Sequence, residues 1–259
     1  MPSPLSVVLL VRNEEDRLPA ALDSVAWADD VVVVDTGSRD GTRELAVRRG
    51  ARLAEVPWEG YVRSRNRAHA EAAHDWVLVL DADERVTPAL RDEIRAALAE
   101  DGAGHEGFSM PRLSHLGKVP VRHGTWYPDV KLRLGRRSAG LRAEGGRVHE
   151  QLLLEGRVGR FRSPLLHFPY RDISDSIRKA SQYARLSAED RWERGARGGV
   201  GALVLRPPFE FVRSFVLKGG FLDGRAGFAT ASLHAASYFL RAAYLLELER
   251  LARRRPAAA

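Results

Sequence analysis

Two aspartates stand directly after an apolar run in the first third of the chain. The run covers residues 76–80, and Asp81 and Asp83 follow it in the sequence Asp-Ala-Asp-Glu. A buried strand that ends in carboxylates places them at the carboxyl edge of a sheet, where open α/β folds bind ligands. Residues two apart on an extended chain point to the same side, so this pair could bind a divalent cation that bridges to a diphosphate. The competing interpretation is that these acids cap a helix that begins near Pro88.

Polar residues also follow two other apolar runs. Asp35 comes after the run 31–34 and opens a turn of Thr, Gly, Ser and Asp, where its carboxylate could accept hydrogen bonds from a base or a ribose. Arg12 and Glu14 follow the run 5–11 and could reach the same nucleotide. A helix predicted near residue 60 offers two further residues that could meet phosphates or the nucleoside, Arg63 and Asn66.

Alternating elements must position these side chains. The apolar period predicts strands at 5–11, 31–34, 52–56 and 76–80, with helices at 13–27, 41–50, 60–74 and 88–99. This alternation predicts an open, mostly parallel α/β sheet. Short strands follow at 107–113, 130–134, 151–154 and 165–168, and then helices at 173–194, 207–218 and 226–253. The chain should therefore end in a helical extension.

Composition narrows the possible chemistry. The 259 residues are 44% hydrophobic and 29% charged, which is a globular balance. The absence of cysteine excludes disulfides, thiolate metal sites and cysteine nucleophiles, so a metal would need oxygen or histidine ligands. No run has the features of a signal peptide or the ~20 apolar residues of a membrane span. We therefore expect a cytoplasmic protein.

Charge is distributed unevenly. The net charge is +7, but residues 1–100 carry −6 and residues 101–259 carry +13. A basic half suggests an anionic partner, such as a nucleic acid, a phosphorylated glycan or an anionic lipid surface, although Arg is frequent throughout the chain. We find no nucleic-acid-binding motif, and the acidic strand ends argue against such a partner. No Gly-x-Gly-x-x-Gly follows the first strand, which argues against a dinucleotide-binding fold.

Three segments together resemble glycosyltransferase family two, which has the GT-A fold. These are SVVLLVRNEE (6–15), VVVVDTGSRDGT (31–42) and VLVLDADERV (77–86), the last with the D-x-D element. WYPDVKLRL (126–134) and KGGFLDGRAGF (218–228) extend the resemblance to the bacterial branch of lipopolysaccharide-core β-glucosyltransferases.

The resemblance implies a GT-A catalytic domain over 1–170, with a Rossmann-like nucleotide-sugar half (1–104) and an acceptor half (105–170). It implies that 171–259 is a separate helical region. It also implies a nucleotide-diphospho-sugar donor (UDP-sugar first), a divalent Mn²⁺ or Mg²⁺ ion, and inversion at the anomeric carbon. The acceptor would be a lipopolysaccharide-core or other lipid-linked glycan.

The resemblance also implies roles for individual residues. Asp35 would contact the nucleoside base, and Asp81 would lie near the ribose or the metal. Ala82 would contact the nucleotide-sugar, and Asp83 would hold the metal with the donor diphosphate.

An inverting transfer needs a base for the acceptor hydroxyl. Many family members carry Glu-Asp on the acceptor side, whereas this chain has His149-Glu150. Glu150 is the first candidate for the base and Asp129 the second. His149 could ligate the metal, contact the diphosphate or only pack. A basic cluster suited to phosphates, or else an exposed edge, follows the strand near 130, at Arg133, Arg136 and Arg137.

The last helices combine aromatic and apolar residues with Arg and Lys. Such a composition suits an interfacial helix on an anionic leaflet, so peripheral contact with the cytoplasmic face of the inner membrane is expected. A helical subdomain that packs on the core, or a homodimer contact, is the alternative. A non-catalytic membrane-surface scaffold is a further alternative, but the retention of Asp81, Asp83 and Glu150 argues against it.

Overall fold

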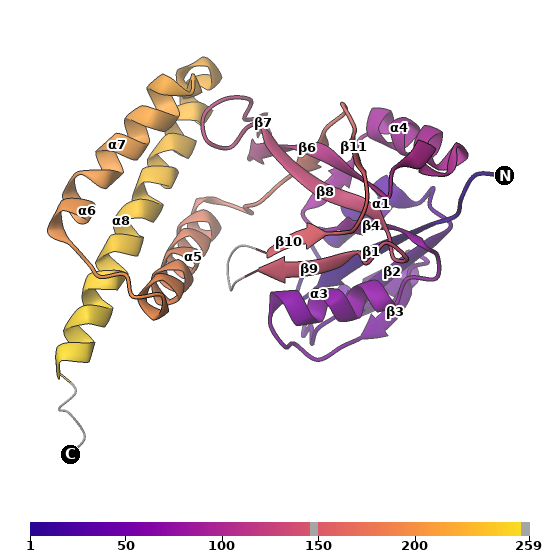
Figure 1. Cartoon of the computed structure of the whole chain (residues 1–259), viewed down its shortest axis with the longest axis horizontal. Coiled ribbons are helices and arrows are strands. Elements are labelled where there is room, and N and C mark those ends of the chain that lie inside the picture. Colours follow the sequence, from indigo (N-terminus) through magenta and orange to yellow (C-terminus); the bar gives the residue numbers. More distant parts are fainter. Residues whose placement is uncertain (146–149, 255–259) are drawn as a thin grey trace. The chain divides into compact units, whose positions relative to one another are not determined.

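The computed structural model of this chain describes residues 1–145 and 150–254 (Figure 1). The described chain forms two compact units. Unit 1 holds residues 1–113, 129–145 and 150–167, and unit 2 holds 114–128 and 168–254. Residues 114–128 group with the helices in unit 2, whereas the predicted division places them in the acceptor half. The predicted boundary after residue 170 stays a prediction.

Four parallel strands form the first half of the sheet in unit 1. They are β1 (Leu5–Val11), β2 (Asp30–Asp35), β3 (Arg52–Glu55) and β4 (Trp76–Leu80). Their order is β3-β2-β1-β4, and β1 pairs with β2 from Ser6 with Asp30 to Val11 with Asp35. All side chains of β4 are buried, as expected for a central parallel strand covered on both faces.

Helices cover both faces of these strands. The helices are α1 (Leu18–Val25), α2 (Thr42–Arg48), α3 (Tyr61–Ala70) and α4 (Pro88–Ala99). One face packs Val7 and Leu78 with residues of α1 and α4, and the other packs Val8 and Val77 with Ala68 of α3. The strand period of two therefore separates the core into two apolar layers.

Helix α4 settles one alternative. Thr87 caps it, because the Thr87 hydroxyl accepts the Leu90 N–H at 3.2 Å, and Pro88 occupies the first turn. The interpretation of Asp81 and Asp83 as caps of this helix is therefore wrong.

The second half of unit 1 adds strands to the same sheet. They are β5 (Glu84–Val86), β6 (Gly107–Leu116), β8 (Asp129–Arg136), β11 (Val158–Arg160) and β12 (Leu165–His167). The order continues β4-β8-β6-β12-β5, and β8 runs antiparallel to both β4 and β6. A separate ribbon pairs β9 (Arg142–Gly145) with β10 (Glu150–Leu153). A short 3-10 helix, η1 (Asp101–Gly104), links α4 to β6. The predicted GT-A-type α/β fold with C-terminal helices is confirmed.

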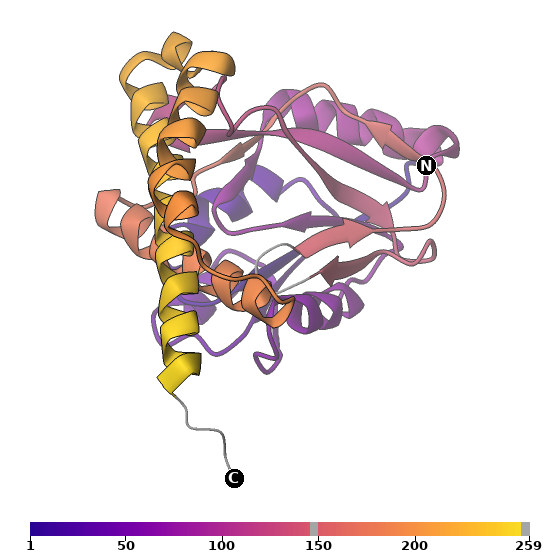
Figure 2. The same ribbon diagram turned by 60° about the vertical axis from the view of Figure 1, so that its left-hand side comes forward.

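Unit 2 is helical. It contains α5 (Ile173–Glu193), α6 (Val200–Val204), α7 (Arg206–Val212), η2 (Arg213–Leu217), η3 (Gly220–Asp223) and α8 (Gly224–Arg254). Helices α6 and α7 lie along α8 (Figure 2). The Ser181 hydroxyl lies 2.7 Å from the Tyr244 hydroxyl and ties α5 to α8. The short strand β7 (Val119–Pro120) pairs with the end of β6. Of the described helices, none has the length and apolar character to cross a bilayer.

Candidate active site

The loops after β1 and β2 brace each other at the carboxyl edge of the sheet. The Asn13 N–H donates to the Ser38 hydroxyl at 2.9 Å, and the Arg39 N–H donates to the Asn13 amide oxygen at 2.8 Å. Glu15 accepts the Gly41 N–H at 2.7 Å. Because backbone N–H groups of each loop donate to side chains of the other, the two loops hold each other in place beside the end of β4.

Asp35 shapes the second of these loops. Its buried carboxylate accepts the N–H groups of Gly37 and Ser38 at 2.9 and 3.0 Å, and the Arg43 guanidinium at 2.7 Å. Burial alone would raise the pKa of Asp35, but these donors outweigh it and hold the pKa below its usual range. The predicted contact with a nucleoside base stays a prediction.

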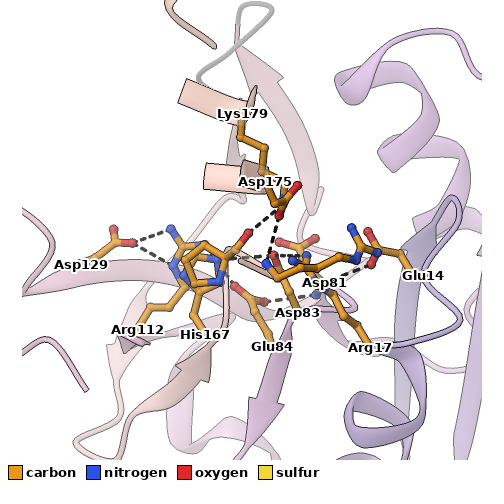
Figure 3. A network of polar contacts seen from close by, with 12 residues as sticks. Glu14, Arg17, Asp81, Asp83, Glu84, Arg112, Asp129, His167, Asp175 and Lys179 are labelled. Atoms are coloured by element: carbon orange, nitrogen blue, oxygen red, sulfur yellow. Dashed lines mark hydrogen bonds and ion pairs between the residues drawn. The ribbon is translucent and has the colours of Figure 1, made fainter. Parts of the chain in front are cut away.

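Residues 81–84 form a tight turn, and this corrects one expectation. The Glu84 N–H donates to the Asp81 carbonyl at 2.9 Å, so the segment is not extended. Asp81 and Asp83 therefore face different partners instead of the same side (Figure 3). The physical reason is that the strand ends at Leu80, and the period of two ends with it.

A buried charge network surrounds Asp81. Its two carboxylate oxygens accept from Arg65 at 3.0 Å and from Arg133 at 2.7 Å. The carboxylate of Glu84, which is fully buried, accepts from Arg133 at 2.5 Å and from Arg112 at 3.2 Å. Buried charges persist only where paired in this way, so the network fixes the base of the site.

The network keeps Asp81 ionised. Burial would raise its pKa, but the guanidinium groups of Arg65, Arg133 and Arg112 outweigh burial and hold the pKa of Asp81 far below its usual range. Burial would lower the pKa of Arg133, yet Glu84 and Asp81 raise it above its ordinary value. Asp81 is therefore a permanent anion and a poor general base.

Asp83 faces a histidine. Its Oδ2 atom lies 3.7 Å from Nε2 of His167, the last residue of β12, and 3.5 Å from Nη1 of Arg17 (Figure 3). The Asp83 and His167 side chains are 19% and 13% exposed, so both remain accessible to a ligand. Carboxylate oxygen and imidazole nitrogen are ligands for divalent metals. Among the described residues no cluster of three or more such side chains could hold a metal ion.

The two candidate bases differ in what the structure describes. Asp129 begins β8, and its Oδ2 atom accepts two hydrogen bonds from Arg112 at 2.8 and 2.6 Å. Its other oxygen lies 3.2 Å from the Lys131 ammonium. Glu150 begins β10, but its side chain lies outside the described part of the chain, as does His149. Their predicted roles stay predictions.

The remaining predicted ligands occupy varied positions. Arg12 and Arg63 are exposed, Glu14 is partly buried near Arg17, and Ala82 is buried in the turn after β4. The Asn66 amide is bonded to the backbone of Ala143, donating at 3.0 Å and accepting at 2.7 Å. Asn66 thus ties α3 to β9, and its contact with a nucleotide stays a prediction.

The predicted phosphate-binding cluster after β8 is used internally. Arg133 is in the Asp81 network, and Arg136 pairs with Asp75 and Asp101 while it lies over the Trp76 ring. Arg137 donates to the Ala72 carbonyl. Arg133 and Arg136 are therefore paired with carboxylates of other elements, whereas Arg137 is exposed and its contact with a phosphate stays a prediction.

Sequence reasoning missed four residues of this site: Arg17, Glu84, Arg112 and His167. Glu84 was visible beside the D-x-D element, and a lone polar residue in the apolar run 165–168 marked His167. Arg17 and Arg112 carried no local signal, since their partners come from distant elements.

Parallel strands that end in carboxylates, with an antiparallel extension beyond them, form a GT-A-type fold. Residues 6–137 match the family model "Glycosyl transferase family 2", and the chain belongs to this family, as its motifs predicted.

Relatives match over nearly the whole chain. The lipopolysaccharide core biosynthesis glycosyltransferase LpsC of Rhizobium meliloti is 33% identical over 254 residues, which is 94% of this chain and 92% of LpsC. The uncharacterized glycosyltransferase RT0209 of Rickettsia typhi is 27% identical, over 94% of this chain and 87% of that protein.

A solved structure matches more distantly. It is the glucosyl-3-phosphoglycerate synthase from Mycobacterium tuberculosis in complex with Mn²⁺, UDP and glucosyl-3-phosphoglycerate, at 25% identity and a TM-score of 0.37. The match covers 45% of this chain and 46% of that chain.

Proposed function

We propose that this chain is an inverting, metal-dependent hexosyltransferase that moves a sugar from UDP-sugar to a lipopolysaccharide-core or other lipid-linked glycan. The observation that carries the proposal is the Asp83–His167 pair at the carboxyl edge of the sheet. The similarity to LpsC along nearly the full length of both chains supports the choice of acceptor.

The pair fits a divalent cation. Asp83 Oδ2 and His167 Nε2 lie 3.7 Å apart and are the two atoms that would hold it. Such a cation would neutralise the charge that develops on the leaving diphosphate. Arg17, at 3.5 Å from Asp83, adds positive charge beside the same position.

The chain's own residues perform the rest of the transfer. A carboxylate takes the proton of the acceptor hydroxyl, while the oxygen of that hydroxyl bonds to the anomeric carbon. The bond from that carbon to the diphosphate breaks, and the electron pair leaves with the diphosphate. The Asp81 network orients the turn that carries Asp83, so Glu84, Arg112 and Arg133 act as positioning residues.

Calorimetric titration with UDP, GDP and CMP, each with and without Mn²⁺, tests the donor and the metal. We expect UDP to bind tightest and only with Mn²⁺, and we expect Asp83→Ala and His167→Ala each to weaken binding by roughly tenfold or more. Val47→Ser, an exposed change on α2, is the matched control. Metal-independent binding, or full binding by both site variants, would remove the assignment.

The base is tested separately. We propose Glu150 for this role, because both oxygens of Asp129 already face cations. Glu150→Gln should lower kcat by roughly 10²-fold or more and leave UDP–Mn²⁺ binding intact, whereas Asp129→Asn should act less on kcat. Equal kcat for wild type and Glu150→Gln would assign the base elsewhere.

A further inference from the structure

One continuous helical segment of unit 2 exposes apolar side chains and buries a charged one, the reverse of an ordinary surface helix. From Leu205, which precedes α7, through η2, the residues Leu205, Phe209, Val212 and Val216 recur at spacings of four, three and four residues, and all are exposed. Such spacing places them on one face. Glu210, by contrast, is fully buried. Apolar residues outside and a carboxylate inside indicate that this face meets something other than water.

The exposed apolar residues extend beyond α7. Six more lie before and after it along the chain, and all ten are between 46% and 71% exposed. Helices α6 and α7, which carry four of the ten, lie along α8 (Figure 2). We call these residues the apolar surface: Val200, Val204, Leu205, Phe209, Val212, Val216, Leu217, Phe221, Leu222 and Phe228.

The exposed charge along residues 196–246, which carry the apolar surface, is positive. Between residues 196 and 246 the sequence has two acids, Glu210 and Asp223, and both are withdrawn from solvent. Glu210 pairs with Arg206 at 2.7 Å and Arg213 at 2.9 Å. Asp223 accepts from the His123 ring at 2.8 Å. Four cations of the same stretch are exposed: Arg197, Arg206, Lys218 and Arg225.

These charges select the occupant. A second copy of the chain would bring the same cations to the interface, and like charges oppose such a contact. Residues 200–222 expose Val, Leu and Phe side chains together with Arg and Lys side chains. The one serine of this segment, Ser214, is buried and so adds no hydroxyl to the exposed face. Apolar side chains flanked by cations fit the hydrocarbon boundary and the phosphates of an anionic lipid layer.

We propose that the apolar surface lies on an anionic lipid bilayer, with its Val, Leu and Phe side chains at the acyl boundary and Arg and Lys at the headgroup phosphates. The contact uses no residue of the sugar-transfer site. That it would bring the enzyme to a lipid-linked acceptor rests on the proposed function.

Co-sedimentation of the full chain with vesicles tests the contact. We expect binding to vesicles of phosphatidylcholine mixed with phosphatidylglycerol, weakening as salt rises, and little binding to phosphatidylcholine alone. The double variant Phe209→Ser/Val212→Ser should bind roughly tenfold more weakly or worse. Lys218→Glu/Arg225→Glu should lose the preference for phosphatidylglycerol.

Controls separate this proposal from its alternatives and from the transfer reaction. Val47→Ser, equally exposed on α2, should bind vesicles like wild type. Asp83→Ala should also bind vesicles normally, so loss of donor binding and loss of lipid binding are independent results. Full vesicle binding by Phe209→Ser/Val212→Ser would overturn the proposal. A second result would also overturn it: the wild type does not bind vesicles, and sedimentation velocity shows that the wild type is a dimer and the double variant a monomer.

Discussion

Single residues in this protein often serve partners far away in the sequence. Arg133 lies 52 residues after Asp81 and joins its carboxylate to that of Glu84. Removing one member of such a buried group leaves the others uncompensated, which costs far more than the net stability that the pairs contribute. The Asp81 network is therefore a device for holding the turn at 81–84 in one conformation.

His69 is buried beside the same network and should make the fold sensitive to acid. Its two ring nitrogens find no hydrogen-bond partner within the described chain. Burial, with the nearby Arg65, Arg133 and Arg137, lowers its pKa to about 3. Below about pH 6.5 the His69 ring takes up a proton in the unfolded chain but stays neutral in the folded protein. The free energy of unfolding therefore falls as pH falls from about 6.5 toward 3.

Replacement of His69 should remove its part of the pH dependence of stability. Between about pH 6.5 and pH 5 the free energy of unfolding should fall by about 2 kcal/mol less in His69→Leu than in wild type. Urea unfolding at both pH values measures the difference. Above pH 7.5 the histidine is neutral in both states, and there the gap between the two proteins should be independent of pH. An unchanged acid dependence in His69→Leu would show that the pKa of His69 is the same in the folded and the unfolded chain.

At the scale of elements, α8 approaches η3 so closely that only glycine fits. A Cβ at Gly227 would overlap the carbonyl oxygen of Gly220. Both glycines belong to the KGGFLDGRAGF segment that the sequence singled out. Gly220 and Gly227 therefore have a packing role within unit 2.

Gly227→Ala should destabilise the protein by roughly 1–3 kcal/mol, because the backbone of η3 would have to move. Gly201→Ala in α6 is the matched control, since a Cβ there meets no atom within 4 Å. That change should be neutral or slightly stabilising, as alanine favours helix. Thermal unfolding of both variants decides the matter, and equal melting temperatures would contradict the close approach.

At the scale of the whole molecule, a loop between two sheet strands belongs to the helical unit. Residues 114–128 leave the sheet after β6, and the chain returns to it at β8. Asp223 accepts the N–H groups of Arg122 and His123 at 2.9 and 2.8 Å. The Ser214 hydroxyl lies 3.1 Å from that of Thr125. The helices therefore hold this loop through bonds that span about a hundred residues.

Asp223→Ala should release the loop. Two backbone donors would lose their acceptor, at a cost of roughly 1–3 kcal/mol. Hydrogen exchange of the Arg122 and His123 amides should quicken, while exchange in β1 and β4 should stay as in wild type. Asp223→Asn keeps one acceptor oxygen and should give an intermediate rate. Unchanged exchange in Asp223→Ala would mean that other contacts hold the loop.

The amino-acid sequence by itself determined the elements and the edge of the sheet that carries the site. Strands β1 and β4 fall on the apolar runs 5–11 and 76–80, and α5 spans 173–193 where the period predicted 173–194. These predictions succeed because burial of a strand or a helix face imposes a period that nearby residues reveal. The place of Asp81 and Asp83 follows from the same reasoning.

Only the tertiary structure decided which groups meet. It turned Asp81 toward Arg65 and Arg133, brought His167 to Asp83, and placed 114–128 with the helices. An ion pair depends on distance in space, and the residues that form it need share no spacing along the chain. The residues of the apolar surface could not be predicted from the sequence either, because which face of a helix stays exposed depends on what packs against its other side.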